Sequence, residues 1–142
     1  MRLRFDLKSV TLVALLLAMT MGHGDGCCSE EASVLGPPTE TTCPPNSTLT
    51  YENFGQGFMQ DFCTDCHATT KVGADRNGAT KDHDFDILAG IRGVALHVDQ
   101  AAGIGPASEN RAMPPADRME QPTDELRRQL AEWLACGAPS VP

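Results

Sequence analysis

The sequence predicts an all-α fold, a small helical domain over residues 48–139. Apolar side chains recur every three or four residues in three separate stretches, which is the spacing of one helical face. No stretch alternates apolar and polar residues as a half-buried strand does. The chain has only five Phe, one Tyr and one Trp in 142 residues. A core this poor in aromatic residues would gain much from a large buried cofactor or from covalent cross-links.

Residues 1–26 are typical of a secretory signal peptide. The basic residues Arg2, Arg4 and Lys8 precede a mostly apolar run over residues 10–21. That run is shorter than the roughly 20 apolar residues that a membrane-spanning helix needs. We therefore expect export to the bacterial periplasm or to the outer face of a membrane.

Two cleavage sites fit this leader. One cut follows Gly22, with Thr20 and Gly22 as the small residues of a signal peptidase site, and adds no lipid. The other follows Gly26 and would leave Cys27 acylated, which would associate the protein with a membrane. Gly24 stands where the bacterial lipobox prefers an aliphatic residue. The sequence leaves both sites open.

The ordered domain is expected to begin after a tether. Residues 27–47 are rich in Pro, Ser, Thr and Glu, a composition that predicts a flexible segment. Thr50 is the expected N-cap of the first helix. The aromatic stripe of that helix consists of Tyr51, Phe54, Phe58 and Phe62. Gly55 and Gly57 lower the helix propensity, and we expect a second helix to approach closely at these positions.

Two further helices are predicted, separated by a loop. After a turn over residues 75–80, an apolar stripe predicts the second helix: Ile87, Leu88, Ile91, Val94, Ala95 and Val98. Residues 103–116 are rich in Gly, Pro and Ala and predict a loop that crosses a surface or a cofactor. The last helix is expected to begin after Pro122-Thr123 and to end at Gly137. Its predicted buried face consists of Leu126, Leu130, Trp133 and Leu134.

The chain is acidic, with a formal net charge of −8. Nucleic-acid binding needs a basic surface, so this balance argues against a nucleic-acid partner. It favours a protein partner with a basic docking surface and a salt-sensitive encounter.

One short motif carries specific chemistry: Cys63-Thr64-Asp65-Cys66-His67, the Cys-x-x-Cys-His pattern of covalent haem attachment. Two thiols at this spacing reach the two vinyl groups on one edge of a porphyrin when the chain turns at a helix end. The next residue, His67, then offers its imidazole to the iron. The other ring nitrogen of such a ligand is usually fixed by a backbone carbonyl.

Three other interpretations of the motif compete with haem attachment. A zinc site needs two more ligands, normally a second close pair, and Cys43, Cys136, His83 and His97 stand singly. A thioredoxin-like dithiol expects an α/β pattern around it, which is absent from the sequence. A structural disulfide would not explain the adjacent histidine. Haem attachment is therefore the preferred interpretation.

On these residues, from about Thr50 to Pro139, the chain resembles the monohaem class I c-type cytochromes. In that family one helix runs into Cys-x-x-Cys-His, a loop carries a methionine followed by proline, and a last helix crosses the first. The corresponding segments here are residues 51–67, 112–115 and 123–136. The resemblance implies a cytochrome c-like helical fold wrapped around one covalently bound haem c.

The resemblance also implies that Met113 is the sixth ligand of the iron. A thioether is soft and neutral, and it raises the reduction potential relative to a second histidine. Pro114 restricts the backbone of Met113 to an extended conformation, which would direct its side chain off a stiff loop. The competing ligands are Met59, Met119, His83 and His97; either histidine would give a bis-His haem of lower potential.

Four cysteines remain outside the motif. Because the family packs its first helix against its last, the resemblance brings Cys43 and Cys136 close enough for a disulfide in an oxidising compartment. The fate of Cys27 and Cys28 stays open.

The expected function is electron transfer rather than enzymatic catalysis. The iron would cycle between Fe(II) and Fe(III) with His67 and Met113 as axial ligands, which leaves no position for a substrate. The alternatives are an open-site or bis-His haem sensor, or a peroxidase-like domain with Arg111 or a loop histidine as the distal group. A haem module of a larger complex is a further alternative.

Overall fold

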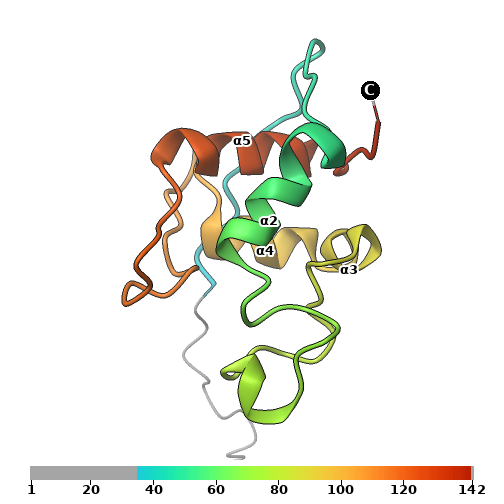
Figure 1. Ribbon diagram of the computed structural model, residues 1–142. Helices are drawn as coiled ribbons and strands as arrows, with labels where there is room; N and C mark the ends of the chain where they lie inside the picture. The colour runs from blue at the N-terminus through green and yellow to red at the C-terminus, as the bar shows by residue number, and fades with distance from the viewer. Residues whose placement is uncertain (1–34, 142) are drawn as a thin grey trace, which may run out of the picture. The chain divides into compact units, whose positions relative to one another are not determined.

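The computed structural model describes residues 35–141, which form helices and no strand. This confirms the all-α class. Figure 1 shows the elements. They are a π-helix η1 (Tyr51–Gly55), α2 (Gln56–Phe62), a 3-10 helix η2 (Gly73–Arg76), α3 (Leu88–Gly93), α4 (Ala95–Ala102) and α5 (Asp124–Ala135). The predicted signal peptide, Cys27 and Cys28 lie outside the described residues. None of the helices within residues 35–141 is both long and apolar enough to cross a membrane.

The first helix begins where the sequence predicts. Thr50 and Asn53 form a capping box: the Asn53 N–H donates to the Thr50 hydroxyl (3.1 Å), and the Thr50 N–H donates to the Asn53 side chain (2.8 Å). The Tyr51 N–H donates to the Pro139 carbonyl (2.7 Å), which ties this helix start to the segment after α5. One π-helical turn, η1, then continues directly into α2.

Helix α5 packs across the first helix at Gly55. A β-carbon at Gly55 would overlap the six-membered ring of Trp133, which is 0% exposed in the centre of the core. The expected close approach is therefore confirmed at Gly55. It is wrong at Gly57, where a β-carbon would meet open space.

This contrast predicts opposite effects for two alanine substitutions. Gly55→Ala should destabilise the protein by about 2 kcal/mol, because the new methyl group collides with a buried indole. Gly57→Ala makes the same chemical change without a neighbour and should stabilise by roughly 0.5–1 kcal/mol through helix propensity. Urea unfolding of both variants measures the difference. Equal effects would contradict the close packing of Gly55 on Trp133.

The second predicted helix is in fact two. The chain leaves helical geometry at Val94 (φ −129°, ψ 27°), between α3 and α4. Arg92, in the last turn of α3, donates two hydrogen bonds to the Ala138 carbonyl (3.0 and 2.8 Å) and fixes α3 to the segment after α5. Ile91 and Val98 are buried as expected, whereas Ile87 lies outside the helix and is 46% exposed.

The last helix matches its prediction closely. Thr123 is the N-cap and accepts from the Leu126 N–H, and Gly137 has the left-handed φ of 82° that ends many helices. Leu130, Trp133 and Leu134 are buried. With residues of α2, α3 and α4, they form one hydrophobic core: Phe58, Met59, Phe85, Ile91, Val98, Ala102, Leu130, Trp133, Leu134 and Ala138.

The predicted tether is wrong for residues 36–43. This segment lacks regular secondary structure, but it lies against α4. The Gly36 N–H donates to the Gln100 carbonyl (2.8 Å). Thr39 is 1% exposed, and its N–H and hydroxyl both donate to the Asp99 carboxylate (2.8 and 2.7 Å). The folded unit therefore extends at least twelve residues further towards the N-terminus than the predicted start at residue 48.

A disulfide joins Cys43 to Cys136, the C-cap of α5, across a sequence separation of 93 residues. This confirms the predicted pair. The bond closes the N-terminal segment onto the last helix.

Candidate haem site

The Cys-x-x-Cys-His motif forms a tight turn at the end of α2. The Cys63 and Thr64 N–H groups both donate to the Met59 carbonyl (2.9 and 3.0 Å). The Cys66 and His67 N–H groups then both donate to the Cys63 carbonyl (3.2 and 3.0 Å). Cys63 and Cys66 are free thiols, although the same chain closes its other described cysteine pair. The turn thus presents two unbonded sulfurs and an imidazole within five residues.

The His67 ring is held in one orientation and one tautomer. Its Nδ1 lies 3.2 Å from the His83 carbonyl oxygen. Since a carbonyl can only accept, Nδ1 carries the proton and Nε2 keeps its lone pair. The ring stacks on Phe85 at 4.6 Å between centroids and 13° between planes. The backbone carbonyl expected behind this histidine is therefore present.

Burial keeps this imidazole neutral. Desolvation lowers the pKa of His67 below its usual value, and the hydrogen bond to the His83 carbonyl opposes that effect without cancelling it. A neutral imidazole with a fixed Nδ1–H is the form in which histidine binds a metal.

The Cys63 thiol holds its proton at neutral pH, whereas a redox-active or zinc-bound cysteine is a thiolate. Burial raises its pKa to about 12, and the positive charge of Arg127 only partly opposes this. Reactive dithiols and zinc ligands need a thiolate at neutral pH. Within residues 35–141, no group of three or more His, Cys, Asp and Glu side chains is arranged to bind a metal ion. The raised pKa of the Cys63 thiol disfavours a reactive dithiol.

Met113 lies on a separate loop that borders the same core. Its N–H donates to the Ala101 carbonyl (2.9 Å), and its half-buried side chain packs against the core, as does Cys63. The Met113–Pro114 peptide bond is cis. The structure thus gathers Cys63, Cys66 and His67 on one turn, and it places Met113 on the loop between α4 and α5.

A buried arginine, Arg127, holds this loop. Its guanidinium, on α5, donates to the carbonyls of Met113 (2.7 Å), Ala102 (3.0 Å) and Asn110 (3.3 Å). Arg127 is 2% exposed, and burial lowers its pKa. Arg127 is not among the residues predicted from the sequence. A signal existed, because Arg127 stands three residues before Leu130 and seven before Leu134, on the apolar face of the helix.

Arg118 connects the same loop to the motif. Its guanidinium lies 3.0 Å from the Cys66 sulfur and 3.3 Å from an Asp65 carboxylate oxygen. The loop that carries Met113 therefore reaches the Cys-x-x-Cys-His turn directly.

The two rival histidines stack on each other near His67. His83 supplies the carbonyl that accepts from Nδ1 of His67, and the centroids of the two rings are 6.3 Å apart. His97 stacks on His83, with 3.4 Å between its Nδ1 and Nε2 of His83. Met113, His83 and His97 all stay candidates for the sixth ligand.

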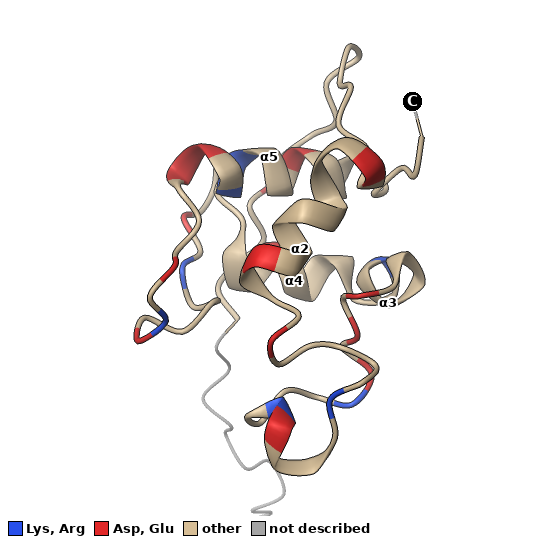
Figure 2. Cartoon of the chain, viewed as in Figure 1, with Lys and Arg blue, Asp and Glu red and all other residues tan. Residues whose placement is uncertain are grey.

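Charged residues of both signs occur on helices and loops of the described part of the chain (Figure 2). Figure 2 shows acidic residues on α2, α5 and several loops, with basic residues between them. The basic docking partner inferred from the net charge of −8 stays a prediction.

Comparison of the chain with models of known protein families, with curated proteins and with solved structures found no match. The assignment of the site therefore rests on its residues and their geometry. Two free thiols and a neutral, oriented histidine on one turn fit the attachment of a haem c.

Proposed function

We propose that this protein is a monohaem c-type cytochrome that carries electrons. Cys63 and Cys66 would hold one haem c by thioether bonds, and His67 and Met113 would ligate its iron. The bound haem would supply the Fe(II)/Fe(III) couple. Export to an oxidising compartment, where such attachment takes place, is part of the proposal. So is a redox partner with a basic docking surface.

One observation carries the proposal: the hydrogen bond between Nδ1 of His67 and the His83 carbonyl, on the turn that holds two free thiols. It leaves Nε2 as the only ring atom that can donate an electron pair to iron. A core histidine without a ligand role does not require two unpaired cysteines at this spacing. The chain's own contribution is to orient this imidazole, to exclude water around it and to hold the second ligand in place.

The surrounding core suits an electron carrier. Phe58 of α2 and Trp133 of α5 are buried in the core, and Phe85 covers one face of the His67 ring. An apolar environment disfavours the more highly charged ferric state and raises the reduction potential. Filling both axial positions leaves little to rearrange when the electron moves, which favours fast transfer.

The open-site alternative receives no support from Arg111. Arg111 is one of the two predicted sources of a distal acid–base group, beside a loop histidine, but its guanidinium pairs with Asp124 (2.6 Å) and Glu109 (3.2 Å) at the surface. Its side chain is 46% exposed. We therefore prefer a closed coordination sphere to a sensor or a peroxidase-like site.

The axial ligands are tested by optical spectra of protein made with a cytochrome c maturation system. We expect a weak far-red absorption band in the oxidised form, typical of methionine bound to ferric haem c. Met113→Ala should lose this band, and the reduced protein should then bind carbon monoxide. Met119→Ala is the matched control, because Met119 is fully exposed at 101%. A band that survives in Met113→Ala would refute ligation by Met113.

A further inference from the structure

We infer that Arg76 tunes the electron donation of His67 through a shared backbone carbonyl, and so sets the reduction potential of the site. Arg76 is a positioning residue here, since it acts through His83 and does not touch the iron. The inference rests on the proposed function.

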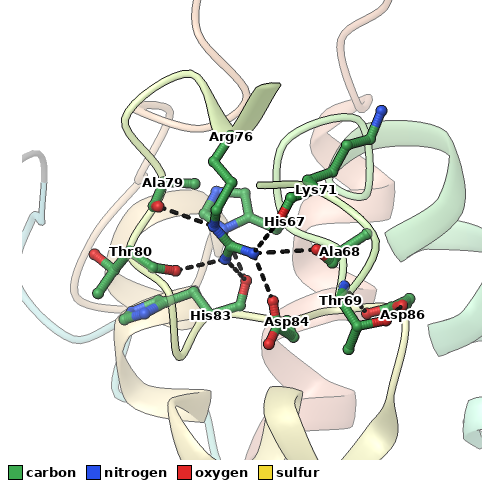
Figure 3. A network of polar contacts seen from close by, with 10 residues as sticks. All are labelled: His67, Ala68, Thr69, Lys71, Arg76, Ala79, Thr80, His83, Asp84 and Asp86. Carbon is green, nitrogen blue, oxygen red and sulfur yellow. Dashed lines mark hydrogen bonds and ion pairs between the residues drawn. The ribbon is translucent and has the colours of Figure 1, made fainter. Parts of the chain in front are cut away.

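Arg76 is a charged residue whose side chain is buried within a loop. It is 8% exposed, at the end of η2, in the segment that connects the haem motif to Phe85. Figure 3 shows its guanidinium at the centre of a polar network. Its acceptors are the carbonyls of Ala68 (3.1 Å), Lys71 (3.4 Å), Ala79 (3.1 Å), Thr80 (2.6 Å) and His83 (3.2 Å), and the Asp84 carboxylate (2.8 Å).

The His83 carbonyl has two donors. Nδ1 of His67 and one terminal nitrogen of Arg76 both lie 3.2 Å from its oxygen. A carbonyl oxygen has two lone pairs, so both bonds form together. The guanidinium withdraws electron density from the oxygen that His67 uses as its acceptor. The carbonyl then accepts less strongly from the Nδ1–H.

The shared carbonyl changes how strongly the His67 imidazole donates electrons to the iron. A strong acceptor behind Nδ1 makes the imidazole more basic and a better donor to the ferric state. A carbonyl already engaged by a cation leaves the ring closer to a neutral imidazole, which favours the ferrous state. Arg76 therefore raises the reduction potential, while Asp84 limits the effect by neutralising part of its charge.

An arginine is required for both parts of this role. Five N–H groups on a rigid plane reach several carbonyls of one loop at the same time, which a lysine ammonium does not match. The network fixes the position of the His83 carbonyl, and the charge sets its strength as an acceptor.

A matched control distinguishes this role from a purely structural one. Arg92 likewise donates to backbone, with two hydrogen bonds to the Ala138 carbonyl (3.0 and 2.8 Å), but no hydrogen bond joins it to His67 or His83. Arg76→Gln and Arg92→Gln remove the same charge from a guanidinium that donates to backbone carbonyls, five for Arg76 and one for Arg92. Only the first removal changes the acceptor of His67.

The experiment measures the reduction potential of haem-loaded wild type, Arg76→Gln, Arg76→Lys and Arg92→Gln. We expect Arg76→Gln to shift the reduction equilibrium about tenfold towards Fe(III), which is about 59 mV for one electron. Arg76→Lys should recover part of the shift, and Arg92→Gln should match wild type. The proton on Nδ1 of His67 should move downfield by NMR in Arg76→Gln, as its hydrogen bond becomes stronger.

If Arg76→Gln does not fold, Arg76→Lys and Asp84→Asn replace it. Asp84→Asn should shift the equilibrium in the opposite direction and move the Nδ1 proton upfield, because the charge on Arg76 is no longer compensated. A folded, haem-loaded Arg76 variant with the wild-type potential and Nδ1 shift would overturn the inference alone. Wild-type protein that takes up no haem would overturn the proposed function, and this inference with it.

Discussion

Replacing Arg127 with methionine should destabilise the protein by about 3 kcal/mol and release the loop that carries Met113. The substitution keeps the unbranched apolar stem but leaves the carbonyls of Ala102, Asn110 and Met113 without their buried donor. An unsatisfied buried acceptor costs on the order of 1–3 kcal/mol. The cost of burying the guanidinium, seen in its lowered pKa, offsets part of this loss.

Two measurements check the Arg127 prediction. Urea unfolding gives the loss of stability, and the far-red band of the oxidised haem protein gives the loss of methionine ligation. Arg128→Met is the matched control on the same helix, because Arg128 is exposed and makes only a 3.9 Å pair with Glu125. Equal behaviour of the two variants would show that Arg127 does not hold the loop.

Removing the disulfide should cost about 4 kcal/mol of stability. The Cys43–Cys136 bond closes a loop of 93 residues, and a cross-link of that length strongly restricts the unfolded chain. It also fixes residues 36–43 beside α4 and α5, where Thr39 and Asp99 form two hydrogen bonds. The segment should become sensitive to proteases when the bond is absent.

Guanidinium unfolding with and without a thiol reductant measures this effect. The wild-type midpoint should fall in reductant to that of Cys43→Ser/Cys136→Ser, while the midpoint of the double variant should not respond. Thioether bonds to haem resist such reductants, so the haem content serves as an internal control. A wild-type midpoint that does not change in reductant would contradict the stabilising role of the bond.

The parts of the fold that depend on local signals were predictable. Thr50, Thr123 and Gly137 act within one helical turn, and the apolar spacing of the first and last helices is unambiguous. The break at Val94 was not predictable, because its apolar stripe is continuous in the sequence. The packed segment at Thr39 was missed because its partner, Asp99, is 60 residues away and its composition resembles a linker.

The site shows the same difference between local sequence signals and contacts that only the folded chain makes. Cys63, Cys66 and His67 form a contiguous motif, and Met113 followed from its proline and its loop. Arg76 and Arg127 were missed because their main partners are backbone carbonyls, which exist at every position and leave no pattern in the sequence. Only the folded loop shows which carbonyls lack a partner.

The central claim is tested most directly by the intact mass of the protein under denaturing conditions, after expression with a cytochrome c maturation system. We predict a mass increase of one haem in the wild type and none in Cys63→Ser/Cys66→Ser, because the thioether bonds survive denaturation. Wild-type protein that is exported and folded but has no added mass would contradict the proposal. The zinc and dithiol interpretations of the motif would then take precedence.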